Sequence, residues 1–116
     1  MHEMSIAYAL LKIVEDRARD NGIVRVTLVR VKVGRLRALE SRQLRAAFEV
    51  LADGSLAAGA TLDIDETPAK ARCKRCANEW RPVGFRLDCP ECGGGDAEIV
   101  EGRELHIESF DGEREP

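Results

Sequence analysis

Four cysteines form two pairs with the spacing of a metal-binding knuckle. They are Cys73 and Cys76, then Cys89 and Cys92, with twelve residues between the pairs. Each Cys-x2-Cys turn brings two sulfur atoms to one side of a tight loop, and two such turns can surround a Zn²⁺ ion with four thiolates. Because four sulfur ligands leave no open coordination position, such an ion stabilises the fold and cannot polarise a substrate. We therefore expect structural zinc at these cysteines.

The alternative for the cysteines is a set of disulfides or a redox-active pair. A single redox pair would leave the second Cys-x2-Cys turn unexplained. Lys12 and Arg17 interrupt the apolar residues near the start of the chain, so we predict neither a signal peptide nor a membrane span and expect a cytoplasmic protein. In a reducing compartment, paired cysteines favour metal binding over disulfides.

The opening tripeptide Met1-His2-Glu3 is a second candidate metal site, of a different kind. A free α-amino group has a pKa of about 8, and the amide nitrogen and imidazole of His2 can complete adjoining chelate rings. Three nitrogens in one plane suit Ni²⁺ or Cu²⁺, and Glu3 is the nearest donor for the remaining position. The alternative is a terminus without function, with Glu3 serving as an acid in the first helical turn.

Hydrophobic periodicity predicts two helices that must support these sites. The apolar residues from Ser5 to Ala18 recur every three or four positions, and Asn21-Gly22 is expected to end this helix. A second helix is expected to have Ser41 as its cap and to stop at Asp53-Gly54. Its apolar stripe consists of Leu44, Ala47, Phe48 and Leu51.

Alternating apolar residues predict three strands. The first is Val24–Val33, with a change of phase at Leu28-Val29 that suggests a bulge. The second contains Leu62 and Ile64, and a third runs from Ile99 to Ile107 before a charged tail. We therefore predict an α+β fold in which two helices pack on a small three-stranded sheet. A zinc-binding module, residues 70–98, is inserted between the second and third strands of the core formed by 1–69 and 99–116.

Charge and motifs narrow the function classes. The net charge of −3 argues against a protein built mainly to hold nucleic acid. Basic residues beside the cysteines have an electrostatic reason to be there, since a Zn(Cys)₄ cluster is doubly negative. They are Arg72, Lys74, Arg75, Arg81 and Arg86. Trp80 is expected to pack within the module. No Gly-rich phosphate loop, catalytic triad or acid pair with usable spacing is present, so we expect no enzyme.

Several segments of the chain match one known family. They are Met1-His2-Glu3-Met4-Ser5-Ile6-Ala7, Val31-Lys32-Val33-Gly34-Arg35-Leu36, Leu44-Arg45-Ala46-Ala47-Phe48-Glu49-Val50-Leu51, the two cysteine pairs and Glu104-Leu105-His106-Ile107. With these segments the chain resembles the HypA family of hydrogenase nickel-incorporation proteins from end to end. Many zinc modules share the cysteine spacing, but its combination with the opening tripeptide is specific.

The resemblance implies two metal sites and a function. Met1, His2 and Glu3 correspond to the family's nickel-binding terminus, and the four cysteines correspond to its structural zinc. The family carries Ni²⁺ as cargo to the large subunit of NiFe-hydrogenase, working with the GTPase HypB, and relatives also serve urease maturation. By this resemblance residues 1–69 and 99–116 are the nickel-binding domain of a cytoplasmic metallochaperone that catalyses no reaction.

The chain departs from the family pattern in one loop. Residues Arg37-Ala38-Leu39-Glu40-Ser41 stand where members commonly have Ser-Gly before the hydrophobic residue and a proline at the start of the second helix. This leaves the loop's conformation and its contacts with a partner open.

Two further alternatives follow from the sequence. His106 is a candidate extra nickel ligand, but the alternation with Leu105 and Ile107 places it toward solvent, so we expect a surface residue. The alternative function is a zinc-ribbon adaptor that binds nucleic acid or protein and has no nickel role.

Overall fold

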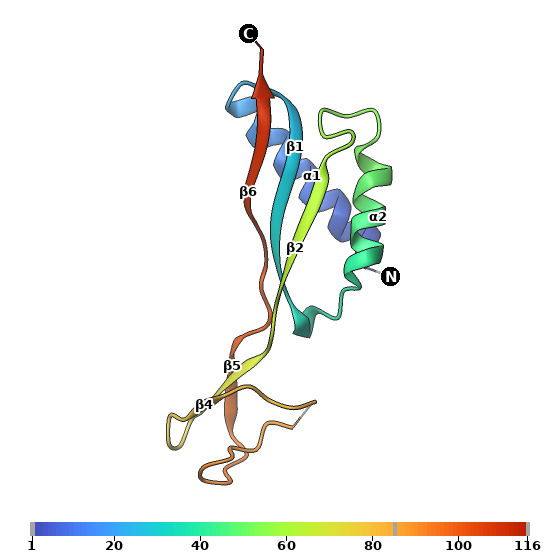
Figure 1. The fold of residues 1–116 in the computed structure, drawn as a ribbon. Coiled ribbons are helices and arrows are strands. Elements are labelled where there is room, and N and C mark those ends of the chain that lie inside the picture. Colours follow the sequence, from blue (N-terminus) through green and yellow to red (C-terminus); the bar gives the residue numbers. More distant parts are fainter. Residues whose placement is uncertain (1, 85, 116) are drawn as a thin grey trace. The chain divides into compact units, whose positions relative to one another are not determined.

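The computed structural model describes residues 2–84 and 86–115. In chain order the elements are α1 (Glu3–Asp20), β1 (Ile23–Gly34), the short 3₁₀ turn η1 (Arg35–Arg37), α2 (Ser41–Ala52), β2 (Thr61–Thr67), β3 (Lys70–Cys73), β4 (Glu79–Trp80), β5 (Ala97–Glu101) and β6 (Leu105–Arg114). Two helices and two three-stranded sheets make up the predicted α+β fold (Figure 1). No helix among the described residues is long and apolar enough to cross a membrane.

Helix α1 is longer than the predicted Ser5–Ala18, because it begins at Glu3 and ends at Asp20. The side chain of Asn21 donates to the carbonyl oxygen of Arg17 at 2.7 Å, and Gly22 follows with a φ of 69°. A left-handed residue directly after a helix favours glycine. The asparagine and glycine therefore end the helix as predicted, and its buried face consists of Glu3, Ala7, Leu10, Leu11, Val14 and Ala18.

Helix α2 packs against α1 and corrects one detail of the prediction. The cap is Glu40, whose carboxylate accepts a hydrogen bond from the backbone N–H of Arg42 at 3.0 Å, whereas Ser41 is the first helical residue. A carboxylate can satisfy a free N–H group of the first turn as a serine hydroxyl does. The buried residues of α2 are Leu44, Ala47, Phe48 and Ala52, while Leu51 is only half-buried.

The first sheet has the strand order β2-β1-β6, with β1 in the centre (Figure 1). Along β1 the buried positions are Val26 and then Val29, Val31 and Val33, so the alternation changes phase near Leu28-Val29. Arg30 of β1 binds Asp111 of β6 through two hydrogen bonds of 3.1 and 3.0 Å. The buried side chains of β1, β2, α1 and α2 pack together and form the hydrophobic core.

The predicted third strand is wrong in one respect, because it consists of two strands in different sheets. Strand β5 pairs antiparallel with β3, placing Ala97 opposite Cys73, whereas β6 belongs to the first sheet and continues to Arg114. Gly102 lies between the two strands and has a φ of 116°, a backbone conformation that residues other than glycine rarely adopt. The residues predicted as a charged tail from Asp111 are thus part of β6 up to Arg114.

The chain divides into two compact units. Unit 1 comprises residues 1–32, 39–65 and 106–116, and unit 2 comprises residues 33–38 and 66–105. Unit 2 contains the second sheet, of order β4-β3-β5, and all four cysteines. It takes in more of the chain than residues 70–98, because the segments 33–38 and 99–105 are joined by backbone hydrogen bonds.

Candidate metal sites

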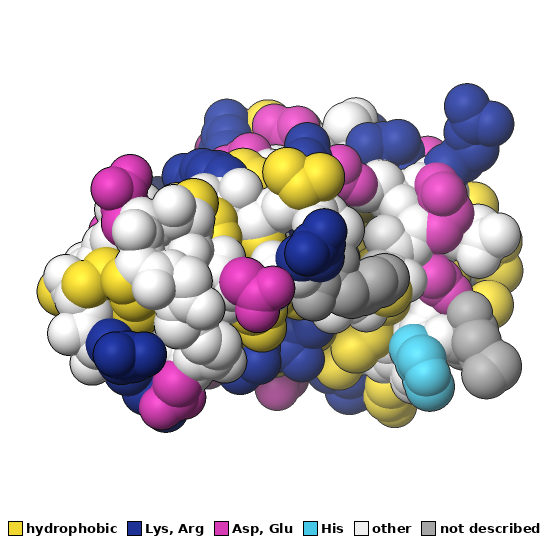
Figure 2. All heavy atoms as spheres, turned by 90° about the horizontal axis from the view of Figure 1, so that it is seen from below, with side chains coloured by type: hydrophobic (Ala, Val, Ile, Leu, Met, Phe, Trp, Pro, Cys, Tyr) yellow, Lys and Arg dark blue, Asp and Glu magenta, His cyan; other side chains and the backbone are white. Residues whose placement is uncertain are grey.

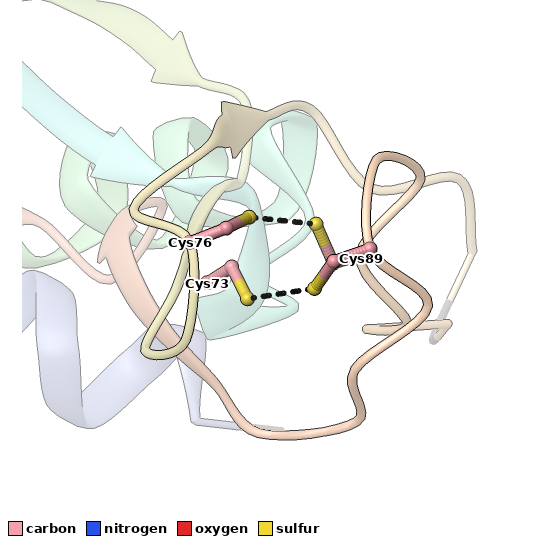
Figure 3. A group of neighbouring side chains, drawn as sticks. Cys73, Cys76 and Cys89 are labelled. Atoms are coloured by element: carbon pink, nitrogen blue, oxygen red, sulfur yellow. Dashed lines mark hydrogen bonds between the residues drawn. The ribbon is translucent and has the colours of Figure 1, made fainter.

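The four cysteines lie together in unit 2, and their side chains point toward one another (Figure 3). Cys73 ends β3, Cys76 lies in the turn that follows, and Cys89 and Cys92 lie in the loop between β4 and β5. All four sulfur atoms are within 4.8 Å of one another. Cys73 and Cys89 are buried, whereas Cys76 and Cys92 are exposed at the surface.

The sulfur positions fit a tetrahedral metal ion. The Sγ atoms of Cys73 and Cys92 are 3.6 Å apart, as are those of Cys76 and Cys89. Four sulfurs at about 2.3 Å from a central Zn²⁺ lie about 3.8 Å from each other. A disulfide would require about 2.05 Å. The cluster therefore has the spacing to hold a metal such as zinc.

The two Cys-x2-Cys turns repeat the same backbone conformation. The N–H of Ala77 donates to the carbonyl oxygen of Cys73 at 2.9 Å, and the N–H of Gly93 donates to that of Cys89 at 2.9 Å. Both residues after the second cysteine are left-handed, with φ of 63° for Ala77 and 74° for Gly93. Glycine adopts this conformation without strain, so Gly93 fits its turn better than Ala77 fits the first.

Backbone N–H groups point at the sulfur atoms. The N–H of Arg75 donates to Cys73 Sγ at 3.3 Å, and the N–H of Gly94 donates to Cys92 Sγ at 3.4 Å. The side-chain amide of Asn78 reaches Cys89 Sγ at 3.8 Å. Such donors stabilise thiolate over thiol, which is the form that binds a metal.

Two thiols of the cluster have pKa values shifted in opposite directions. Burial alone would raise the pKa of Cys89, but the N–H groups of Cys92 and Glu91 outweigh it and lower that pKa to about 6. At Cys76 the N–H of Asn78 favours the thiolate, yet the neighbouring Cys89 sulfur and burial raise the pKa to about 12.

The basic side chains around the cysteines are largely paired with acids. Arg72 binds Glu79 at 2.6 Å, and this contact raises the pKa of Arg72 and lowers that of Glu79. Further pairs are Arg72 with Glu98 at 3.5 Å, Lys74 with Asp96 at 3.7 Å, Arg81 with Glu101 at 3.1 Å and Arg86 with Asp88 at 3.9 Å. A phosphate backbone would have to compete with these carboxylates for the guanidinium groups. Trp80 is half-buried and lies opposite Ala71 in the second sheet.

The amino-terminal candidate site is described from His2 onward, because Met1 lies outside the described residues. His2 is exposed and is the N-cap of α1, and its carbonyl oxygen accepts hydrogen bonds from Ile6 N–H at 3.0 Å and Ser5 Oγ at 3.1 Å. Its imidazole lies at the positive end of the helix dipole. The structure therefore presents His2 at the surface, where a metal ion can reach it.

Glu3 has surroundings that the sequence did not reveal. Its side chain is only 8% exposed, and its Oε2 atom accepts a hydrogen bond from the backbone N–H of Glu40 at 3.0 Å. The first turn of α1 is thereby joined to the residue that caps α2. Glu40 lies in the loop that departs from the family pattern, and no local sequence signal connects residues 37 positions apart.

His106 does not join either cluster. It is exposed on β6 between the half-buried Leu105 and Ile107, as the alternation predicts. Among the residues that the structure describes, the four cysteines are the one group of three or more His, Cys, Asp or Glu side chains that brings its donor atoms close together.

The sequence as a whole matches a family model. The model is described as "Hydrogenase/urease nickel incorporation, metallochaperone, hypA" and matches residues 1–112. The chain belongs to the HypA family. Because this is a family of metallochaperones, the chain is not an enzyme.

Relatives and solved structures agree with this family. The hydrogenase maturation factor HypA of Streptomyces avermitilis is 44% identical over 112 residues, which cover 94% of this chain and 85% of the relative. HypA of Chlorobium luteolum is 41% identical over 110 residues, covering 95% and 94%. The solution structure of the Ni metallochaperone HypA from Helicobacter pylori has a TM-score of 0.71 to this chain at 27% identity, covering 99% and 100%.

Proposed function

We propose that this HypA family member binds Ni²⁺ through its amino-terminal residues Met1, His2 and Glu3 and delivers it to the large subunit of NiFe-hydrogenase. A HypB-type GTPase assists the delivery, and urease maturation is a second destination. The four cysteines hold a structural Zn²⁺. Transfer takes place in the cytoplasm, where the reducing conditions keep cysteines available as thiolate ligands.

The observation that carries this proposal is the extent of the family match. It covers residues 1–112 and so includes both the opening tripeptide and the cysteine cluster. The α-amino group, the amide nitrogen of His2 and its imidazole would supply three nitrogen donors in one plane, which is the arrangement that Ni²⁺ favours. Sulfur donors in a tetrahedron suit zinc instead, so the two sites select different ions.

The position of His2 favours release of the cargo. A cation bound at the N-cap of α1 meets the positive end of the helix dipole, which opposes it by about 0.3–1 kcal/mol. Protons compete with the metal ion for the amine and the imidazole, so acidification should release nickel. A weak, reversible site is what transfer by ligand exchange requires.

Glu3 would contribute to this site through the backbone as well as through its side chain. Its carboxylate accepts from the N–H of Glu40, and moving it onto a nickel ion would break that hydrogen bond. The backbone amide of Glu3 is next in the chain after that of His2 and lies in the first turn of α1. We therefore assign the Glu3 amide as the preferred fourth donor and its carboxylate as the group that anchors the terminus beside α2.

Delivery is tested by a nickel transfer assay with purified components. Nickel-loaded protein is mixed with the hydrogenase large-subunit precursor and the HypB-type GTPase, and nickel in the precursor is measured after separation. The proposal predicts transfer by the native chain and by His106→Ala, and no transfer by His2→Ala. Equal transfer by His2→Ala and the native chain would contradict it, and zinc content measured in parallel shows whether each variant is folded.

A further inference from the structure

Unit 2 contains an apolar cavity that the metal sites do not use. It has a volume of about 270 Å³ and is lined by Leu36, Ala69, Pro82, Leu87, Ile99 and Arg103. Pockets for whole small-molecule ligands measure about 300–1,000 Å³. A cavity below that range, lined by aliphatic groups, has the size to take one large hydrophobic side chain.

The walls of this cavity are held in place by hydrogen bonds within unit 2. The N–H of Leu36 donates to the carbonyl oxygen of Gly102 at 2.9 Å, and Arg37 Nε donates to that of Arg103 at 2.7 Å. On the other side, the guanidinium of Arg81 donates to the carbonyl oxygens of Pro68 and Ala69 at 3.2 and 3.4 Å. Hydrogen bonds therefore hold the side of the cavity formed by Leu36, Ala69 and Arg103, which reduces the ordering that a ligand must impose there.

Leu36 remains at the surface although it lines the cavity. It is 39% exposed, and its Cδ1 lies 3.2 Å from the position that a Cβ on Gly102 would occupy. A leucine held over a glycine and left accessible to solvent loses the stabilisation that burial would give it. A ligand side chain in the cavity would cover it.

The rim of the cavity carries positive charge. Arg103 lines it, and Arg35 and Arg37 flank Leu36 in sequence; all three are exposed. Among the described residues, no ion pair involves Arg35, Arg37 or Arg103, in contrast to Arg81 and Arg86 nearby. Glu101 is already bound to Arg81, and an oxygen of Glu104 accepts from the N–H of Gly102 at 2.8 Å.

Figure 2 shows a face of the molecule on which Lys and Arg side chains alternate with Asp and Glu, with hydrophobic side chains exposed between them. Arg103 lines the apolar cavity, Arg37 donates to the carbonyl oxygen of Arg103, and no ion pair in the described part of the chain involves these two arginines or Arg35. Guanidinium groups beside an apolar cavity match a ligand that combines carboxylates with a hydrophobic side chain.

We propose that this cavity docks a hydrophobic side chain from an acidic segment of a partner protein, with Arg35, Arg37 and Arg103 binding the flanking carboxylates. This proposal is independent of the nickel site, since none of its residues belongs to the opening tripeptide. It would therefore survive a negative result with His2→Ala.

The test is an NMR titration of zinc-loaded, ¹⁵N-labelled full-length protein with a capped peptide, Glu-Glu-Leu-Phe-Glu-Glu. Amide shifts are expected at Leu36, Ala69, Leu87, Ile99 and Arg103. Two control peptides, with Lys in place of Glu or with Ser-Ser in place of Leu-Phe, should bind at least about tenfold more weakly, because each lacks one half of the recognition.

Variants of the protein separate this cavity from other surfaces. Leu36→Ser and Arg103→Glu should each weaken binding of the acidic peptide by about tenfold or more. The matched controls are Val83→Ser, an 86% exposed residue in the same loop that does not line the cavity, and Arg25→Glu in unit 1. Both controls should bind as the native protein does.

Three results would overturn the proposal. They are binding unaffected by Leu36→Ser and Arg103→Glu in folded, zinc-loaded protein, equal binding of the lysine peptide, and no shifts with the acidic peptide. Shifts at the cavity residues that depend on protein concentration alone would instead assign this surface to a second copy of the chain. The same shifts on addition of a DNA duplex would assign it to nucleic acid.

Discussion

Replacing Gly34 by alanine should strongly destabilise the protein. A Cβ at Gly34 would lie 2.0 Å from the carbonyl oxygen of Gly102, 2.1 Å from its carbon and 2.5 Å from the nitrogen of Arg103. These are backbone atoms, which cannot rotate away as the end of a side chain can. The two segments must therefore separate by roughly 1 Å to reach an ordinary contact distance.

The cost can be estimated from the contacts beside this crossing. The N–H of Gly34 donates to Glu104 O at 2.7 Å, and the N–H of Leu36 donates to Gly102 O at 2.9 Å. Losing both hydrogen bonds costs about 1–3 kcal/mol, and the displaced packing costs about 1–3 kcal/mol. The reduced freedom of the unfolded chain returns about 0.4–1 kcal/mol. The net loss is about 3 kcal/mol, a large part of the roughly 5–15 kcal/mol that keeps a domain folded.

The assay is urea denaturation of zinc-loaded protein followed by circular dichroism, with zinc content measured for each variant. Gly95→Ala is the matched control, because the nearest atom to its Cβ would be Asp88 Oδ1 at 3.9 Å, an ordinary contact. That variant should stay within about 1 kcal/mol of the native protein. A Gly34→Ala variant as stable as Gly95→Ala would refute the reasoning.

Three other substitutions test separate parts of the account. Phe48→Ala empties a fully buried position in α2 and should lower the free energy of unfolding by about 3–5 kcal/mol in calorimetry, a larger loss than exposed Val50→Ala gives. Cys73→Ser removes a buried sulfur, so the zinc measured by atomic absorption should fall well below one ion per chain; an unchanged zinc content would contradict the four-sulfur site. Arg30 lowers the pKa of Asp111 by hydrogen bonding to it, so this pair stabilises the fold above the ordinary aspartate range and ceases to do so as the pH falls through the lowered pKa. Asp111→Asn should therefore lower the thermal midpoint slightly at neutral pH and leave it unchanged at low pH or in high salt, and an equal loss at low pH would contradict an ionic role.

The sequence predicted those structural features that depend only on residues close together in the chain. The helix ending at Asn21-Gly22, the phase change in β1 and the exposure of His106 each depend on neighbouring residues alone. The spacing of the cysteines likewise predicted their convergence, because each Cys-x2-Cys turn is a local structure and two turns are enough for a tetrahedron.

The features that the sequence did not predict depend on contacts between distant residues. The second sheet includes β4, which has only two residues, Glu79 and Trp80, and is too short to show an alternation. The split between β5 and β6 at Gly102 follows from pairing with β3 and from a close approach to Ala69. Glu3 looked like a surface acid because nothing in its own segment indicates the N–H group of Glu40.

The central claim is that nickel binds at the amino terminus and zinc at the cysteines. Isothermal titration of Ni²⁺ into zinc-loaded protein with a native, untagged first residue tests it most directly, using His106→Ala as the histidine control and His2→Ala as the site variant. The account predicts one bound Ni²⁺ for the native chain and His106→Ala, no binding for His2→Ala, and unchanged zinc in all three. Undiminished nickel binding by His2→Ala, or a sulfur-to-nickel charge-transfer band in the spectrum of the loaded protein, would contradict it.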